Sequence, residues 1–179
     1  MNNTALVIID TQVGVIGSAY KGKEVIANIN TLLAQARSSH TPVIYVQHDG
    51  TKGDGLEVGT AGWAIHPAIA PHEGDLIVHK RASDSFYDTI LKHELEAQGI
   101  KHLIVVGGAT EWCVDTTIRR ALVEGYDVLL VSDAHTTEDY DGAVLTAAQR
   151  IAQLNHFVTG FSVDDREIVV KPTSEVKLS

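Results

Sequence analysis

The chain has 179 residues, of which 44% are hydrophobic and 21% are charged. Such a composition is typical of a globular protein with its own core, so disordered and fibrous classes are excluded. The 14 Lys and Arg against 23 Asp and Glu give a formal net charge of −9, which disfavours nucleic acid and anionic membrane surfaces as partners. The length predicts a single domain over residues 1–179.

The location of the protein is predicted from short apolar runs and from cysteine usage. The longest runs, Ala5–Ile9 and Leu103–Val106, are far shorter than the roughly 20 residues that a membrane helix needs. No basic region followed by a small-residue cleavage site is visible at the start of the sequence. The single cysteine, Cys113, excludes an internal disulfide. We therefore expect a cytoplasmic protein that does not contact a membrane.

Strand-like and helix-like segments alternate along the chain. In chain order the prediction is strand Ala5–Ile9, helix 25–36, strand Val43–Val46, strand Leu76–Val78, helix 86–95, strand Leu103–Val106, helix 113–122 ending at Gly125, strand Val128–Val131, helix 145–154 and a weaker strand Ile168–Val170. Strands that alternate with helices favour parallel pairing through right-handed crossovers. The predicted fold is a three-layer α/β/α sandwich around a central parallel sheet, a Rossmann-like arrangement.

Apolar spacing predicts which face of each helix points inward. The first helix presents one stripe, from Val25 to Ala36. The inward residues predicted for the second and fourth helices are Phe86, Ile90, Leu91 and Leu95, and Leu145, Ala148, Ile151, Ala152 and Leu154. The segment Gln47–Gly74 lacks any sustained periodicity, and long irregular loops in compact domains are usually functional. We expect this loop to wall a pocket.

Three chemically distinct side chains follow predicted strands: Asp10, Lys80 and Cys113. In an open parallel sheet, ligands bind beyond the carboxyl ends of the strands, so these residues are expected to meet there. Taken singly, Asp10 is explained as a cap, Lys80 as a surface lysine and Cys113 as a small buried hydrophobe. Their joint placement favours a site with an acid, a base and a thiol.

Cys113 has the surroundings expected of a nucleophile. A helix start and the Lys80 ammonium are both expected to lower the pKa of its thiol. The preceding pair Gly107-Gly108 allows a sharp turn that can aim backbone N–H groups at an oxyanion. Asp10 would accept the thiol proton and return it to a leaving amine.

Four motifs resemble the isochorismatase-like cysteine hydrolases, a family that includes nicotinamidases and N-carbamoylsarcosine amidohydrolase. They are Val7-Ile8-Ile9-Asp10-Thr11-Gln12, Lys80 with Ser85-Phe86 and Thr89 to Leu91, Gly107 to Val114, and Val131-Ser132-Asp133-Ala134. The resemblance implies an Asp10, Lys80, Cys113 triad. It also implies a cis peptide bond between Gly108 and Ala109, an oxyanion hole formed by the N–H groups of Ala109 and Cys113, and a homo-oligomer.

The sequence departs from the metal-binding members of that family. Nicotinamidases hold a metal through a D-x-H motif, whereas this chain has Asp49-Gly50-Thr51. His48, Asp49, His66 and His72 are the remaining ligand types in the loop, but scattered loop histidines are usually solvated or capping. We therefore predict no metal and no cofactor.

The retained cysteine favours hydrolysis of a small-molecule C–N bond through a thioacyl-enzyme intermediate. The alternatives are a vinyl-ether hydrolase, like the members that give the family its name, and a non-catalytic thiol-sensing or binding module. Gln12, Trp63, Phe86 and Trp112 are candidates for the substrate pocket, while Asp133 and His135 are interpreted as structural.

Overall fold

The computed structural model describes residues 3–178, so the ends of the predicted domain, residues 1–2 and 179, lie outside it. Seven strands form one sheet in the order β3-β2-β1-β4-β5-β7-β6. Their bounds are β1 Thr4–Ile9, β2 Val43–His48, β3 Leu76–Lys80, β4 His102–Gly108, β5 Asp127–Thr136, β6 Ser162–Val163 and β7 Arg166–Lys171. All pairings are parallel except the one between β6 and β7. The predicted parallel α/β sheet is thus confirmed.

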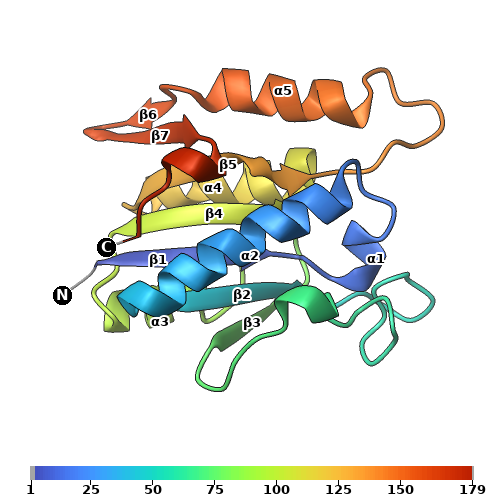
Figure 1. Cartoon of the computed structure of the whole chain (residues 1–179), viewed down its shortest axis with the longest axis horizontal. Coiled ribbons are helices and arrows are strands. Elements are labelled where there is room, and N and C mark those ends of the chain that lie inside the picture. The colour runs from blue at the N-terminus through green and yellow to red at the C-terminus, as the bar shows by residue number, and fades with distance from the viewer. Residues whose placement is uncertain (1–2, 179) are drawn as a thin grey trace.

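Helices cover both faces of the sheet and give the three predicted layers (Figure 1). The α-helices are α1 Val13–Ile16, α2 Gly22–Ser39, α3 Leu91–Ala97, α4 Asp115–Val123 and α5 Ala147–Val158, with 3-10 turns at Pro67–Ile69 and Thr173–Glu175. The long helix α2 packs on one face, whereas α3, α4 and α5 contribute to the core on the other. No helix within residues 3–178 is long and apolar enough to cross a membrane.

The two cores explain why the central strands are continuously hydrophobic. Alternate residues of β1 go to opposite sides, with Leu6 and Ile8 packing toward α2 and Val7 and Ile9 toward α3 and α4. All four side chains are at most 1% exposed. Burial on both faces requires a nearly unbroken apolar run in the sequence.

The helix predicted over residues 86–95 is α3, and it is shorter than its apolar spacing predicts. It begins at Leu91, and Ile90 is 53% exposed. The Asp84 carboxylate accepts a hydrogen bond from the N–H of Phe86 at 2.8 Å, and Asp88 adopts a φ of 53°. A left-handed residue cannot continue a right-handed helix, so Phe86 lies in a turn that precedes α3.

The inward face of α5 was predicted only in part. Its buried residues are Ala147, Arg150, Leu154 and Val158, of which Leu154 was predicted, whereas Ala152 of the predicted stripe is exposed. A buried arginine shares this face, which a count of apolar residues cannot detect. The short strand β6, antiparallel to β7, was not predicted because its two residues carry no periodic signal.

Candidate active site

Asp10, Lys80 and Cys113 meet at the carboxyl edge of the sheet, beyond the ends of β1, β3 and β4. Lys80 Nζ lies 2.6 Å from Asp10 Oδ2 and 3.2 Å from Cys113 Sγ, and it also donates to the carbonyl of Ala82 at 3.0 Å. Lys80 and Asp10 are each only 2% exposed. The charged pair is therefore shielded from solvent, and the thiol is its neighbour.

Lys80 reaches Asp10 across the end of β2, which separates their strands in the sheet. His48, the last residue of β2, pairs in register with Lys80, and its Nδ1 lies 3.4 Å from the ammonium. Asp10 itself has a φ of 44°. An aspartate in this left-handed region is uncommon and costs of order 1–3 kcal/mol, so the surrounding structure must hold it there.

A close approach of β4 to β1 brings the cysteine turn to the same edge. Gly107 has a φ of 121°, and a Cβ atom at this position would lie 2.0 Å from the carbonyl oxygen of Ile9. The peptide bond between Gly108 and Ala109 is cis. Residues Thr110–Val114 then form one π-helical turn before α4, and Cys113 lies within it.

The electrostatics of Cys113 differ from the prediction that its pKa is lowered. Burial raises the pKa of the thiol to about 12, the negative charge of Asp10 acts in the same direction, and the Lys80 ammonium opposes both. Burial alone would lower the pKa of Lys80, but the negative charge of Asp10 and the contacts with Asp10 and Cys113 outweigh it, and the pKa is raised. At rest the site therefore holds a thiol beside an ammonium.

Asp10 retains one acceptor atom that the rest of the described chain does not use. Its Oδ2 binds Lys80, whereas the buried Oδ1 has no hydrogen-bond partner within residues 3–178. Leaving a buried carboxylate oxygen without a hydrogen-bond donor costs free energy, and a donor from another group removes that cost. Oδ1 is therefore suited to take the thiol proton.

His135 supports the turn that contains Cys113. Its imidazole is buried, with Nδ1 2.9 Å from Thr110 Oγ1 and Nε2 2.9 Å from Asn155 Oδ1. Because Asn155 donates through Nδ2 to the Ser132 carbonyl, its Oδ1 is the acceptor, so His135 carries its proton on Nε2 and accepts from Thr110. Burial lowers the pKa of His135 and keeps it neutral. Asp133, the other residue interpreted as structural, accepts from the N–H of Thr173 at 2.8 Å.

The long loop after β2 is held in place by hydrogen bonds of the Gln12 side chain, so this amide is not free to bind a ligand. Gln12 is fully buried, donates to the carbonyls of His48 and Trp63 at 2.9 Å, and accepts from the His48 N–H at 2.9 Å. The candidate role of Gln12 in substrate binding was therefore wrong. Each polar atom of its amide is used to attach the loop.

Asp49 holds a tryptophan in place of the metal suggested by its position. Its Oδ1 accepts hydrogen bonds from Trp63 Nε1 at 2.8 Å and from His79 Nδ1 at 3.0 Å, and the rings of Trp63 and His79 stack. Residues 3–178 contain no group of three or more His, Cys, Asp or Glu arranged to bind a metal ion. Trp63, which is half-buried, thus anchors the loop to Asp49.

A hollow of about 230 Å³ adjoins the cysteine turn. Its lining residues are Gly14, Val15, Leu56, Ala109, Glu111, Trp112, Thr137, Glu138 and Tyr140. Leu56 comes from the long loop, which therefore walls a hollow as expected. Trp112 is 58% exposed and faces it, whereas Phe86 is 8% exposed and stacks on Tyr126 in the core. Phe86 thus packs inward, as its apolar spacing predicted, and does not line this hollow.

An ion pair beside this hollow was missed by the sequence analysis. Glu111 binds Arg150, which also donates to the Glu138 carbonyl at 2.6 Å and lies over the ring of Tyr140. The pair connects α5 to the cysteine turn. Its signal in the sequence is a single arginine within a mainly apolar helix.

Comparisons with known proteins identify the family to which the fold belongs. The family model described as Isochorismatase domain matches residues 4–161. A streptothricin hydrolase of Streptomyces noursei is 36% identical over 142 residues, which cover 78% of this chain and 51% of that protein. The chain therefore spans about half the length of that relative. Ureidoacrylate amidohydrolase RutB of Agrobacterium fabrum is 29% identical, with 74% of this chain and 75% of that protein covered.

A solved structure extends the likeness to nearly the whole fold. An isochorismatase from Pseudomonas putida KT2440 superimposes with a TM-score of 0.88 and 32% identity, covering 98% of this chain and 90% of that one. The residues matched by the family model, 4–161, include Asp10, Lys80 and Cys113. On its sequence and its fold, this chain belongs to the isochorismatase family.

Proposed function

We propose that this chain is a cysteine hydrolase that cleaves the C–N bond of a small-molecule amide. The observation that carries the proposal is the position of Lys80 Nζ, 2.6 Å from Asp10 and 3.2 Å from Cys113 in a buried group. A nucleophile, a proton acceptor and a fixed positive charge are the parts that acyl transfer needs. The similarity to proteins named streptothricin hydrolase and ureidoacrylate amidohydrolase supports C–N hydrolysis.

Acylation begins with the protonated thiol. Asp10 accepts the proton of Cys113 as Sγ forms a bond to the amide carbon, and the N–H groups of Ala109 and Cys113 stabilise the developing oxyanion. The C–N bond then breaks, and the amine leaves with the proton held by Asp10. The product of this step is a thioester on Cys113.

Deacylation uses the same groups in reverse order. Asp10 takes a proton from water, the resulting hydroxide adds to the thioester carbon, and the C–S bond breaks. The carboxylic acid is released and the proton returns to Cys113. Lys80 remains charged throughout and stabilises the thiolate and the carboxylate in turn.

The test is turnover of a panel of small amides, with release of ammonia or amine as the readout and mass spectrometry to detect an acyl group on Cys113. Cys113→Ala is expected to lose at least ~99% of the activity, because no nucleophile remains. Ser132→Ala, on β5 and outside the triad, is the control. Activity of Cys113→Ala at more than a few per cent of wild type would refute the covalent mechanism.

The same assays distinguish the two other functions. A vinyl-ether hydrolase would release a keto acid from a vinyl ether and no amine from any amide. A thiol-sensing module would show reversible oxidation of Cys113 and no turnover of either substrate class. Either result would replace the proposed amide hydrolysis.

A further inference from the structure

The hollow of about 230 Å³ beside the cysteine turn carries charge of one sign only. Of the described residues that line it, the charged ones are Glu111 and Glu138, and none is a lysine, arginine or histidine. Its walls come from α1, the loop after β2, the cysteine turn and the segment between β5 and α5, which lie at one end of the molecule (Figure 1). A small molecule that enters this hollow therefore meets carboxylates.

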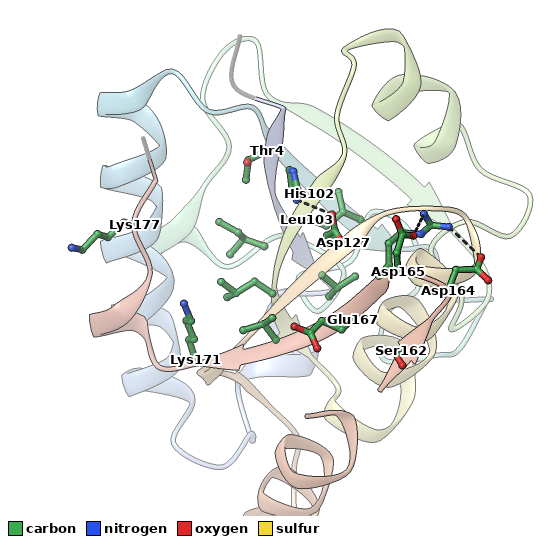
Figure 2. A pocket seen from close by; sticks show the side chains of 15 residues that line it. Thr4, His102, Leu103, Asp127, Ser162, Asp164, Asp165, Glu167, Lys171 and Lys177 are labelled. Carbon is green, nitrogen blue, oxygen red and sulfur yellow. Dashed lines mark hydrogen bonds and ion pairs between the residues drawn. The ribbon is translucent and has the colours of Figure 1, made fainter. Parts of the chain in front are cut away.

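This single sign of charge does not simply follow from the acidic composition of the chain. The larger hollow of about 600 Å³, toward the amino ends of β4, β5 and β7, is lined by charges of both signs. Figure 2 shows Lys171 and Lys177 on one side of it and Asp164 and Asp165 on the other. The purely acidic lining is thus a property of the hollow that adjoins the cysteine turn.

The cation behind the wall of the smaller hollow is already matched by groups of the chain. Arg150 binds Glu111, lies 4.0 Å from Asp139 and donates to the Glu138 carbonyl. Its side chain is 8% exposed and does not line the hollow. Glu111 keeps a second oxygen, Oε2, that is buried and has no hydrogen-bond partner within residues 3–178. The wall therefore retains an acceptor that a donor from a ligand could satisfy.

Glu138 is the carboxylate that a ligand reaches directly, because this residue is exposed where it lines the hollow. Its Oε2 accepts a hydrogen bond from the hydroxyl of Ser18. No lysine, arginine or histidine forms an ion pair with the Glu138 side chain within the part of the chain that the structure describes. A hydroxyl donor carries no charge, so the negative charge of Glu138 remains uncompensated.

Two aromatic rings lie beside these carboxylates. Trp112 and Tyr140 both line the hollow and are 58% and 52% exposed. Arg150 already lies over the ring of Tyr140, 4.6 Å from its centroid, whereas no ring or cation among residues 3–178 stacks on Trp112. The face of an indole is the aromatic surface that attracts cations most strongly. Trp112 is therefore available for a positively charged group.

We propose that the substrate is an amide that also carries a cationic group, an ammonium or a guanidinium, and that Glu138 and Trp112 bind this group in the hollow. The proposal rests on the proposed amide hydrolysis and adds the charge of the substrate. A carboxylate and an indole face both attract a cation, whereas an anionic substrate would be repelled by two carboxylates. Because Trp112 precedes Cys113, the cationic group is expected within a few bonds of the scissile amide.

The test uses the single cysteine of the chain as a reporter that needs no turnover. Cys113 is modified by three methanethiosulfonates, the cationic 2-aminoethyl, the neutral methyl and the anionic 2-sulfonatoethyl reagent. Each rate is divided by the rate of the same reagent with free N-acetylcysteine amide, so that differences in intrinsic reactivity cancel. Wild type is expected to favour the cationic over the anionic reagent at least ~10-fold.

Substitutions in the hollow are expected to change this ratio. Glu138→Gln should lower it about 3-fold, because one charge is removed with little change of shape, and Glu138→Lys should reverse the preference. Trp112→Leu should also lower the ratio, whereas Trp112→Phe, which keeps an aromatic face, should retain most of it. Glu73→Gln, at an exposed carboxylate in the turn before β3, is the control and should leave the ratio unchanged.

Turnover of three amides of equal chain length gives a second measurement. 4-Aminobutanamide, pentanamide and glutaramate carry a positive charge, no charge and a negative charge at the same position. The cationic amide is expected to have a kcat/KM at least ~10-fold above that of the neutral one. Glu138→Gln should raise KM for 4-aminobutanamide and leave pentanamide unchanged, since Glu138 binds the cation and takes no part in the chemistry.

A modification ratio that is equal in wild type, Glu138→Gln and Glu138→Lys would overturn the proposal, and so would a wild-type preference for the anionic reagent. Equal hydrolysis of 4-aminobutanamide and pentanamide would refute the cationic substrate while amide hydrolysis stands. Preference for the cationic reagent without hydrolysis of any amide would instead support the cation site and refute amide hydrolysis. Circular dichroism of each variant verifies that it is folded.

Discussion

Two groups of opposite charge face the Cys113 thiol, and they act on its pKa in opposite directions. Asp10 raises the pKa and Lys80 lowers it, while burial raises it to about 12. The thiol is therefore protonated at neutral pH, and in the proposed mechanism it loses its proton as it attacks the substrate. The sequence indicated that these three residues meet, but burial could not be predicted from it, and burial is the largest influence.

This opposition gives a prediction for alkylation of Cys113 by iodoacetamide. Asp10→Asn removes a charge that raises the pKa of the thiol, so alkylation at pH 9 should be about 10-fold faster than in wild type if the pKa falls by one unit. Lys80→Ala removes the charge that lowers the pKa, so alkylation should be about 10-fold slower for a rise of the same size. Rates against pH, followed by mass spectrometry, provide the measurement.

The rate of amide turnover distinguishes a proton-transfer role of Asp10 from a purely electrostatic effect on the thiol. Asp10→Asn should hydrolyse amides about 10² to 10⁴ times more slowly although its thiol ionises more readily, because asparagine cannot accept or return the proton. Shifts of the alkylation rate in the same direction for both variants would contradict the assigned arrangement of charges.

At the scale of elements, the approach of β4 to β1 places the cysteine turn. Gly107→Ala would put a methyl group 2.0 Å from the backbone oxygen of Ile9, which cannot move without distorting β1. Gly74 also has a positive φ, of 93°, but a Cβ atom there would meet nothing within 4 Å. Comparing alanine substitutions at the two glycines therefore separates the cost of a steric clash from the cost of the backbone conformation.

We expect Gly74→Ala to cost about 1–2 kcal/mol, the usual penalty of a left-handed alanine. Gly107→Ala should cost at least about 2 kcal/mol more, because the clash adds to the same conformational penalty. Urea unfolding of both variants gives the two free energies. Equal losses would mean that the strands can separate to admit the methyl group.

His135 on β5 must be neutral to accept the hydrogen bond from Thr110 in the cysteine turn. Burial lowers the pKa of His135, so the unfolded chain binds a proton at a pH where the folded chain does not. Stability is then fully present above the unfolded pKa of about 6.5 and falls as the pH drops below it, by up to ~1.4 kcal/mol per pH unit.

We predict that this acid sensitivity is lost when the imidazole of His135 is replaced. Between pH 6.5 and 5.0, wild type should lose more free energy of unfolding than His135→Gln, as measured by urea denaturation. His93→Gln, at a side chain that is 81% exposed on α3, should behave like wild type. A slope in His135→Gln equal to that of wild type would place the acid sensitivity elsewhere.

Elements whose sequence is a continuous run of apolar residues could be predicted. Elements whose buried face or boundary depends on a polar side chain could not. The strands β1, β2 and β4 are buried on both faces, so their hydrophobic runs identify them. The face of α5 was misassigned because Arg150 is buried to bind Glu111, and the start of α3 because Asp88 is left-handed. Gln12 illustrates the same limit within the site, since hydrogen bonds to the distant His48 and Trp63 decide its role.

At the scale of the whole molecule, the two ends of the sheet are distinct. The triad lies at the carboxyl ends of β1, β3 and β4, whereas a hollow of about 600 Å³ lies toward the amino ends of β4, β5 and β7. A strand of six residues is roughly 20 Å long, which separates the two regions.

This separation predicts that catalysis does not depend on the residues that line the hollow at the amino ends. Lys171→Glu should keep the wild-type kcat and KM toward any amide substrate, because no residue that lines this hollow belongs to the triad. Lys52→Glu, in the exposed loop after β2, is the charge-matched control. Steady-state kinetics of wild type and both variants provide the measurement. A loss of activity in Lys171→Glu alone would show that the two ends of the sheet are coupled rather than independent.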